Sequence, residues 1–429
     1  MRVAFYTLGC KVNQYETRII EQQFIENGFD VVDTSAEADI YVINSCTVTA
    51  TGDKKTRQIV HRFKKKNPEA IIVLTGCFPQ AYPEDAKAIE EADIVTGTRD
   101  RNGLFGLVQQ FISDGKRVVK ITPHEKGEEF EKMCAKGFFE RTRAFVKIQD
   151  GCNRYCSYCI IPTARGPIRS KELEDIKNEL VTLVKEGYKE VVLVGINLSL
   201  YGKEFGLRLI DAIKVACSVE GIERVRLGSI EPELITDEDL KEMASLKEFC
   251  PQFHLSLQSG CTDTLKRMNR HYTADEYAEL VQKIRNAFEN PAITTDIMVG
   301  FPSEDEREFE ESCEFVKKIK IAKSHVFSYS RRPNTRADRM PDQITKAEKE
   351  IRSRRLIEVC DKVREEFLQT QVGVVCEVLF ETFDNSLGYF GYSENYTPVY
   401  IKCEQDPRGE IKTVKITSSY GDYCTGELV

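Results

Sequence analysis

The stretch AIIVLTGCFP, residues 70–79, runs from an apolar segment straight into a glycine and a cysteine. Two other apolar runs end in the same way, VAFYTLGC at Cys10 and IYVINSC at Cys46. Short β-branched runs without polar alternation predict strands that helices cover on both faces of a parallel sheet. Ligands of such sheets bind outside the carboxyl ends of the strands, so the thiols of Cys10, Cys46 and Cys77 are expected to share one small volume.

The composition predicts a soluble protein of several domains. The chain has 429 residues, of which 41% are hydrophobic and 30% charged, and about three domains are expected at this length. No apolar run approaches the ~20 residues of a membrane span, and the first apolar residues belong to a strand rather than to a signal peptide. Fifteen cysteines in such a chain favour metal or redox chemistry over disulfides. We therefore expect a cytoplasmic protein without a membrane partner.

Positive charge is concentrated in two stretches of a chain whose net charge is −8. Residues 54–66 contain seven Lys and Arg and no acid, and residues 331–364 contain eleven Lys and Arg against six Asp and Glu. One such run usually marks a solvated helix face. Two such runs in a chain that is acidic overall favour a polyanionic partner, because positive charge can be concentrated locally.

The pattern of strands and helices divides the chain into three regions. Residues 1–118 alternate strands with helices, which predicts a parallel α/β sheet; the strands are expected at 2–8, 39–44, 70–75 and 92–96, and the helices near 14–27, 53–66 and 102–113. A charged segment, PHEKGEEFEKMCAKG, follows at residues 123–137 and is expected to be a linker.

The second region, residues 138–366, contains six further strands separated by helices, and the third, residues 367–429, contains short strands with turns. The six strands are AFVKIQ, EVVLVGI, RVRLGS, FHLSLQS, ITTDIMVG and HVFSYS. Six units are too few for a closed eight-fold barrel, so we expect an open, partial (βα) barrel that works at the C-terminal ends of its strands. The third region predicts a small antiparallel β-barrel from the runs VVCEVLF, GYFGYS, PVYIKC and IKTVKITS, with nine Asp and Glu against four Lys and Arg.

Helix starts are marked by a hydroxyl residue three positions before an acid. The expected pairs are Thr236 with Asp239, Thr273 with Glu276, Ser303 with Glu306 and Thr345 with Glu348.

The loop after the first barrel strand carries a second group of cysteines. It reads DGCNRYCSYCIIPTARG, and Cys152, Cys156 and Cys159 have the spacing C-x3-C-x2-C. Structural zinc takes four ligands, usually from two C-x2-C pairs. Three thiolates on one short loop suit an iron–sulfur cluster that keeps one iron open for a substrate.

This motif on the first loop of a partial barrel resembles the radical S-adenosylmethionine (SAM) enzymes. In that family SAM chelates the open iron with its amino and carboxylate groups, and one electron from the cluster cleaves it to methionine and a 5′-deoxyadenosyl radical. Tyr158 matches the aromatic position that packs beside the adenine of SAM.

The whole chain resembles the methylthiotransferases within that family. The segments TLGCKVNQYE, NSCTVT, TGCFPQ and DGCNRYCSYCIIP carry the resemblance, together with a small TRAM-like C-terminal β-domain. TLGCKVNQ and KIQDGCN are most similar to the subfamily that converts N6-threonylcarbamoyladenosine at position 37 of tRNA, next to the anticodon, to its 2-methylthio derivative. The resemblance implies that Cys10, Cys46 and Cys77 hold an auxiliary 4Fe–4S cluster. It also implies two clusters, SAM, tRNA, an external one-electron donor and a sulfur source.

Several polar residues at strand ends are candidates for contacts with SAM, although each could instead satisfy nearby backbone. They are Gly195, Asn197, Ser229, Glu231, Ser256, Gln258 and Asp296. Arg165 and Arg169 are candidate phosphate or carboxylate partners. Lys64, Lys65 and Lys66 are expected to bind tRNA. Arg331, Arg332 and Arg336 follow the last barrel strand, and at least one is expected to bind the carboxylate of the threonylcarbamoyl group.

Three alternatives remain open at this stage. The substrate could be isopentenyladenosine in tRNA, or an aspartate of a ribosomal protein, which the acidic C-terminal region favours because a tRNA-binding module is expected to be basic. An alternative of another class is a non-catalytic iron–sulfur or electron-transfer protein. A full barrel around a cluster with an open iron argues against that class.

Overall fold

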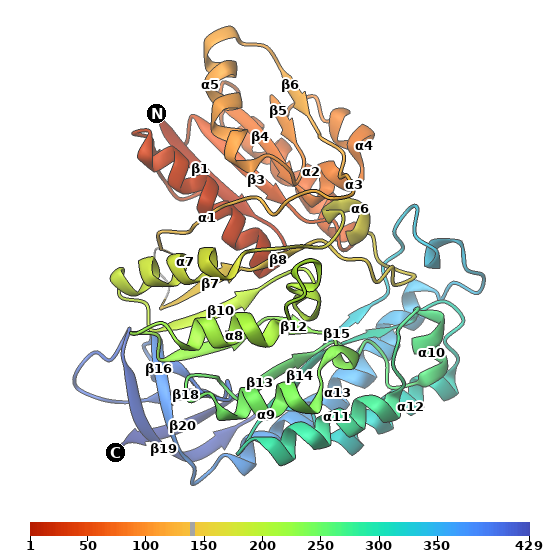
Figure 1. Cartoon of the computed structure of the whole chain (residues 1–429). Helices are drawn as coiled ribbons and strands as arrows, with labels where there is room; N and C mark the ends of the chain where they lie inside the picture. Colours follow the sequence, from red (N-terminus) through yellow and green to blue (C-terminus); the bar gives the residue numbers. More distant parts are fainter. Residues whose placement is uncertain (138–141) are drawn as a thin grey trace.

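The computed structural model describes residues 1–137 and 142–429, and Figure 1 shows three regions packed on one another. The first is a parallel sheet in the order β2-β1-β3-β4-β5-β6. Its strands are β1 (Arg2–Thr7), β2 (Asp30–Val31), β3 (Ile40–Ser45), β4 (Ile71–Gly76), β5 (Ile94–Thr96) and β6 (Val118–Lys120). The four predicted strands are confirmed. The edge strands β2 and β6 were not predicted, because two or three residues are too few for a periodic signal.

Helices cover both faces of this sheet, as the uninterrupted apolar strands predict. They are α1 (Lys11–Glu26), α2 (Ala50–Lys66), α3 (Cys77–Ala81), α4 (Pro83–Lys87), η1 (Arg101–Gly103) and α5 (Leu104–Asp114). Phe63 of α2 belongs to the core on one face, and Phe24 of α1 and Phe105 of α5 belong to the core on the other. Every residue of β3 and β4 is buried.

The second region is a parallel sheet that curves without closing, in agreement with the predicted partial barrel. Its strands are β7 (Arg143–Lys147), β10 (Glu190–Val194), β11 (Arg224–Leu227), β12 (Ser229–Ile230), β13 (Gln252–Leu255), β14 (Ala292–Val299) and β15 (Lys323–Ser328). One sheet has the order β11-β10-β7 and the other β12-β13-β14-β15. Because β11 and β12 are separated only by Gly228, a single interrupted strand joins the two sheets. Among the described residues, β7 and β15 do not pair with each other.

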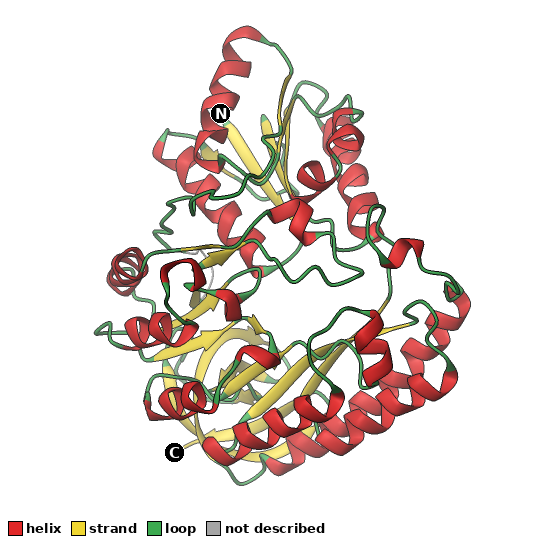
Figure 2. Cartoon of the chain, turned by 45° about the vertical axis from the view of Figure 1, so that its right-hand side comes forward, coloured by secondary structure: helices red, strands yellow, loops and turns green. Residues whose placement is uncertain are grey.

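The first helix of this region, at residues 161–165, packs against α3 of the first region, and the longer helices lie along the outer side of the strands (Figure 2). The helices of this region are α6 (Ile161–Arg165), α7 (Leu173–Lys185), α8 (Leu209–Cys217), α9 (Asp237–Ser245), α10 (Thr262–Arg267), α11 (Ala274–Ala287), α12 (Glu306–Ile319) and α13 (Lys346–Thr370), with β8 (Gln149–Asp150), β9 (Arg169–Ser170) and the short helices η2 (Leu198–Leu200), η3 (Lys203–Phe205), η4 (Pro232–Leu234) and η5 (Ala337–Arg339) between them. In the described part of the chain, no helix combines the length and the apolar character needed to cross a bilayer.

Three of the four predicted helix starts are confirmed and one is wrong. Thr236, Thr273 and Thr345 each accept a hydrogen bond from the backbone N–H three residues later. Ser303 does not cap α12; Asp305 does, by accepting from the backbone N–H of Glu308. Ser303 has a φ of +62° and its N–H donates to the carbonyl of Asp342, so it belongs to the turn before the helix.

The third region is a closed five-stranded barrel in the order β16-β17-β18-β20-β19. Its strands are β16 (Val375–Asp384), β17 (Gly388–Ser393), β18 (Pro398–Ile401), β19 (Ile411–Tyr420) and β20 (Tyr423–Leu428). The strand β20 was not predicted, and the β18–β20 pair is parallel although an antiparallel barrel was expected. A closed ring with an odd number of strands cannot alternate direction throughout, so one parallel pair is required.

The segment expected to be a linker is packed between the first two regions. Met133 and Ala135 are 5% and 0% exposed. The Tyr15 hydroxyl and the Lys171 ammonium group both donate to the carbonyl of Met133, at 3.1 and 2.8 Å. The segment therefore joins α1 to the barrel. The predicted boundary at residue 138 lies outside the described residues.

A candidate two-centre active site

The strand register places Cys10, Cys46 and Cys77, here called the sheet trio, at one edge of the first sheet. Thr7 pairs with Asn44 and Asn44 with Thr75, so β1, β3 and β4 end side by side. Parallel strands present their carboxyl ends at the same edge. The cysteines that follow these strands are thereby brought together although they are far apart in the sequence.

The glycines before two of these cysteines are required by the close approach of the strand ends. Gly76 has a φ of +101°, and a Cβ there would lie 2.6 Å from the Ser45 carbonyl oxygen. Gly9 has a φ of +110°, and its Cβ would lie 3.2 Å from the Cys46 sulfur. Only glycine combines such a backbone with such contacts. The Gly-Cys motif therefore marks where the chain must turn to present a thiol.

The thiols of the sheet trio are close enough to affect one another's ionisation. The pKa of Cys77 is raised to about 12, chiefly by burial; Arg165 opposes the shift, and the neighbouring Cys46 and Cys10 contribute to it. Burial also raises the pKa of Cys46, and Cys10 adds to this shift. Three neighbouring thiolates repel one another unless cations lie between them, and the irons of an iron–sulfur core would supply that positive charge.

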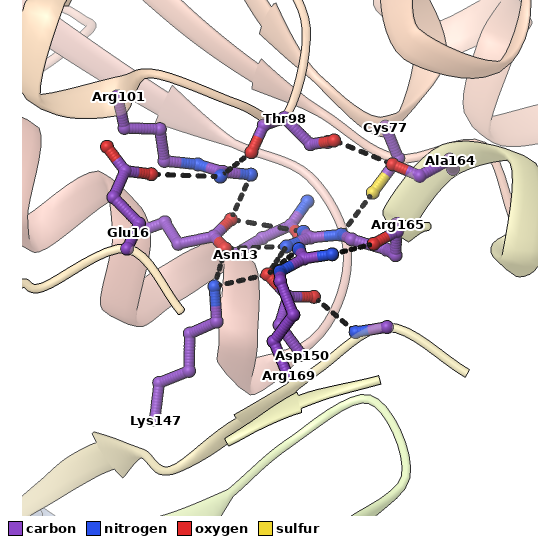
Figure 3. A network of polar contacts seen from close by, with 12 residues as sticks. Asn13, Glu16, Cys77, Thr98, Arg101, Lys147, Asp150, Ala164, Arg165 and Arg169 are labelled. Atoms are coloured by element: carbon purple, nitrogen blue, oxygen red, sulfur yellow. Dashed lines mark hydrogen bonds and ion pairs between the residues drawn. The ribbon is translucent and has the colours of Figure 1, made fainter. Parts of the chain in front are cut away.

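A buried network of charges lies directly behind Cys77 (Figure 3). Arg165 donates from Nε to the Cys77 sulfur at 3.2 Å and from its two terminal nitrogens to both oxygens of Glu16, at 2.5 and 3.0 Å. Six charged side chains form the core of the network, and each is at most 4% exposed: Glu16, Arg101, Lys147, Asp150, Arg165 and Arg169. Arg165 and Arg169 thus have carboxylate partners within the chain.

The two central carboxylates are held in the charged form. Burial opposes ionisation of Glu16, but Arg101, Arg165 and Lys147 outweigh it and lower its pKa to about 2. Burial likewise opposes ionisation of Asp150, and Lys147, Arg165 and Arg169 lower its pKa well below the usual range. Four cations thus face two carboxylates at the core of the network. Two further carboxylates, Glu128 and Glu131, lie 3.6 Å from Arg169 and 3.9 Å from Arg101, so carboxylates of the chain compensate these buried cations.

The second trio, Cys152, Cys156 and Cys159, is here called the loop trio. It lies on the loop that follows β8, and the N–H of Cys152 donates to the Gly166 carbonyl at 3.1 Å. Hydrogen-bond donors also point at its sulfurs: the Arg270 guanidinium lies 3.3 Å from the Cys156 sulfur and the Asn197 amide 3.7 Å from that of Cys152. Burial raises the pKa of Cys159, with a further contribution from Cys156. Donors rather than acceptors around the sulfurs fit thiolates bound to a cluster.

Two strand-end residues predicted to contact SAM carry buried acceptors with no donor in the described structure. They are the side-chain oxygens of Asn197 and Gln258. Buried polar atoms are normally paired, so these two fit a bound ligand that donates hydrogen bonds, as the amino and hydroxyl groups of SAM can. Gly195 lies against Gln149, because a Cβ at this position would be 2.9 Å from the Gln149 side-chain oxygen.

The other strand-end candidates have partners within the protein. The Ser229 and Ser256 hydroxyls lie 2.8 Å apart. Glu231 forms an ion pair with Arg270, the residue that also contacts Cys156. Burial opposes ionisation of Asp296, but the hydrogen bond and charge of His254 lower its pKa; the two side chains lie 3.4 Å apart. Tyr158 meets Phe301 edge-on, with ring centroids 6.3 Å apart.

The basic residues predicted to contact substrate are placed in different environments. Lys64 binds the Ala70 carbonyl and Asp93, and Lys66 binds three carbonyls of the loop at residues 34–36, whereas Lys65 is exposed. Arg332 is buried and binds Asp53 and Thr47 of the first region. Arg331 pairs with Asp338 at the surface, and Arg336 is exposed.

A cavity of about 580 Å³ lies between Cys10 of the sheet trio and the strands of the barrel. Its lining includes Cys10, the strand-end residues Gly195 and Ser229, and Tyr392 and Tyr396 of the C-terminal barrel. All three regions therefore contribute to one chamber. Among the described residues, no three His, Cys, Asp or Glu side chains converge closely enough to hold a single metal ion.

Several residues of the site were not found by sequence reasoning. Three of them, Glu16, Lys147 and Asp150, lie in the same sequence segments as the cysteines. Glu16 could have been found, because it is a charged residue at a helix position that faces the core. Arg270 has no local signal, because it reaches Cys156 from a separate loop. His254 and His325, from β13 and β15, have ring centroids 6.2 Å apart, and no sequence spacing indicates that pair.

The three regions match three family models. Residues 2–97 match the Uncharacterized protein family UPF0004, residues 146–316 the Radical SAM superfamily and residues 369–429 the TRAM domain. The structure is similar to that of a radical S-adenosylmethionine methyltransferase, TsrM, from Kitasatospora setae, with a TM-score of 0.58 at 13% identity, covering 90% of this chain and 80% of that one. The fold and the loop trio thus define a radical SAM protein.

Sequence comparison gives a narrower result. The chain is 39% identical to the Threonylcarbamoyladenosine tRNA methylthiotransferase MtaB of Bacillus subtilis, over all of this chain and 96% of that one. It is 32% identical to the tRNA-2-methylthio-N(6)-dimethylallyladenosine synthase of Clostridium novyi, over 99% of this chain and 95% of that one. The chain belongs to the radical SAM methylthiotransferase family.

Proposed function

We propose that this protein adds a methylthio group to C2 of N6-threonylcarbamoyladenosine at position 37 of tRNA. The observation that carries the proposal is the shared cavity, in which Cys10 of the sheet trio and the barrel strand ends Gly195 and Ser229 face the same space. The threonylcarbamoyl substrate is preferred because the relative named for it is more similar than the relative named for dimethylallyladenosine.

We assign the loop trio to a 4Fe–4S cluster that binds SAM and the sheet trio to an auxiliary 4Fe–4S cluster. When bound, these groups supply radical chemistry and a transferable sulfur and methyl group. The protein's own residues hold and tune them: Arg270 and Asn197 donate to the loop sulfurs, and Arg165 donates to Cys77. The buried oxygens of Asn197 and Gln258, which have no donor in the described structure, support this assignment because bound SAM would donate hydrogen bonds to them.

The chemistry of the target carbon explains why such cofactors are needed. The C2 hydrogen of adenine is not acidic, so proton removal by a positioned base offers no easy route. An external one-electron donor and a sulfur source are required in addition. We place the reaction in the cytoplasm, where its tRNA substrate is found.

The test is anaerobic reconstitution followed by mass spectrometry of tRNA nucleosides. Three substrates are compared: tRNA with threonylcarbamoyladenosine, tRNA with isopentenyladenosine and tRNA with unmodified adenosine. We expect the 2-methylthio product from the first alone. Comparable methylthiolation of isopentenyladenosine would contradict the substrate assignment, and absence of any methylthio nucleoside from all three would contradict the activity on tRNA.

A further inference from the structure

The cavity beside Cys10 is lined by positively charged side chains. Lys11, Arg143, Arg226 and Lys323 line it, and no Asp or Glu is among the lining residues within the described structure. A cavity with such a lining favours an anionic ligand wherever one of these cations has no carboxylate partner of its own.

The charges of Arg143 and Arg226 are already compensated. Arg226 lies 2.7 Å from a carboxylate oxygen of Glu190, and Arg143 lies 3.0 Å from one of Glu381. Tyr396 also covers both guanidinium groups, with the ring centroid 5.0 and 5.1 Å away. These two arginines therefore fasten the C-terminal barrel to the wall of the cavity.

Lys11 differs from these two arginines because it has no charged partner among the described residues. It is the first residue of α1, directly after Cys10, and its side chain makes no hydrogen bond or ion pair with the described residues. Lys11 is an exposed residue that lines the cavity next to Cys10 and Gln14. Its ammonium group is thus a free donor beside a cysteine assigned to the auxiliary cluster.

The geometry of adenine explains why a cation next to Cys10 is relevant to substrate recognition. In adenine, C2 and C6 flank the same ring nitrogen, so a substituent on N6 and the hydrogen on C2 occupy one edge of the base. When C2 is presented to the sheet trio, the threonylcarbamoyl group must lie beside it. A residue that recognises the carboxylate of that group is therefore expected next to a cysteine of the sheet trio.

Resting on the proposed function, we propose that Lys11 binds the carboxylate of the threonylcarbamoyl group and so determines substrate specificity. An ammonium–carboxylate hydrogen bond in an enclosed site is stronger than a neutral one. An isopentenyl group, which has no acceptor, would leave the Lys11 donor unpaired and would be penalised. From the sequence, this role was expected of at least one of Arg331, Arg332 and Arg336. Of these, Arg332 already pairs its charge with Asp53.

The test compares two tRNA substrates that differ only in charge: one with the natural carboxylate and one in which it is converted to the primary amide. The wild-type enzyme is expected to prefer the carboxylate by about 10- to 100-fold in kcat/KM, as for a hydrogen bond to a charged group. The Lys11→Met enzyme is expected to lose activity on the carboxylate substrate but not on the amide substrate, so that the preference disappears. The Lys11→Arg enzyme, which retains the positive charge, is expected to keep the preference. Iron content and SAM cleavage without tRNA should match the wild type in both variants.

A matched control is Lys323→Met, which removes a lysine from another part of the same cavity. It is expected to keep the preference for the carboxylate. Equal loss of the preference in both methionine variants would indicate that the positive potential of the whole cavity, rather than Lys11, selects the carboxylate, and would contradict the inference. A wild-type enzyme that does not distinguish the carboxylate from the amide would also contradict it, and this result does not depend on how any variant folds. A wild-type enzyme inactive on threonylcarbamoyl-tRNA would instead contradict the proposed function itself.

Discussion

The loop trio follows β8 on one short loop, whereas the sheet trio is assembled from the ends of β1, β3 and β4. Their electrostatic settings also differ. The cation beside the loop trio, Arg270, is paired with the single carboxylate of Glu231, while Arg165 beside the sheet trio belongs to a buried network of several cations and carboxylates. A local motif can hold its sulfurs with little help from the rest of the chain. A dispersed one depends on strand register and on the contact between domains.

The largest difference between the trios should appear when each is removed. Replacing Cys152, Cys156 and Cys159 with Ala is expected to remove about half of the iron of the reconstituted protein and to abolish SAM cleavage, because the open iron that binds SAM is lost. Replacing Cys10, Cys46 and Cys77 is expected to remove the other half and leave cleavage measurable. Iron analysis and release of 5′-deoxyadenosine measure both effects. Full iron content in either variant would contradict the ligand assignment.

A substitution of Arg165 tests whether the sheet trio depends on the buried network. Arg165→Met leaves Glu16 and Asp150 with one fewer buried cation, which is expected to cost about 3–5 kcal/mol in the free energy of unfolding. Urea denaturation of the iron-free protein measures this loss.

The matched control for Arg165 is Arg331→Gln. Arg331 is 57% exposed and pairs with Asp338, so this change should cost no more than about 1 kcal/mol. Equal effects of the two substitutions would show that the network does not stabilise the domain contact.

The network also predicts a pH dependence. The pKa of Glu16 is lowered to about 2, below the value of about 4.3 in an unfolded chain. A lowered folded pKa contributes stability above the unfolded pKa, and the contribution is lost as the pH falls through the folded pKa. The free energy of unfolding should therefore decrease between about pH 5 and pH 2, and less steeply in Glu16→Gln. Identical slopes in both proteins would contradict the lowered pKa.

The smallest expected effect concerns the outer surface of the domain that carries the sheet trio. Lys54, Lys55 and Lys65 are exposed on α2 and make no ion pair with the described residues. Changing them to Gln should weaken tRNA binding and reduce its salt dependence by about 0.7–0.9 log units for each phosphate that is no longer neutralised. Fluorescence anisotropy at several salt concentrations measures this.

Lys64 and Lys66 of the same helix provide the control, since both bind carbonyls of their own domain. Changing these two to Gln should lower stability more than tRNA affinity. If neither set alters the salt dependence, α2 is an ordinary solvated helix.

The strands, the helix starts and both cysteine trios could be read from the sequence because each depends on local patterns. Uninterrupted apolar runs identified β3 and β4, and a fixed spacing identified the loop trio. The cap of α12 was misplaced because Ser303 and Asp305 compete within three residues, and only the left-handed backbone of Ser303 decides between them. The strands β2, β6 and β20 were missed because two are very short and the third follows a tight turn.

The sequence by itself thus determined the class of chemistry, since thiols at the ends of parallel strands and on a C-x3-C-x2-C loop have few other uses. Tertiary structure alone decided which charges meet. Arg165 reaches Cys77 and Glu16 across a domain boundary, Arg332 is used by Asp53, and Lys11 is left without a partner among the described residues of the cavity. Electrostatic energy depends on distance and burial rather than on position in the chain, so the role of a charged side chain becomes visible only when the chain is folded.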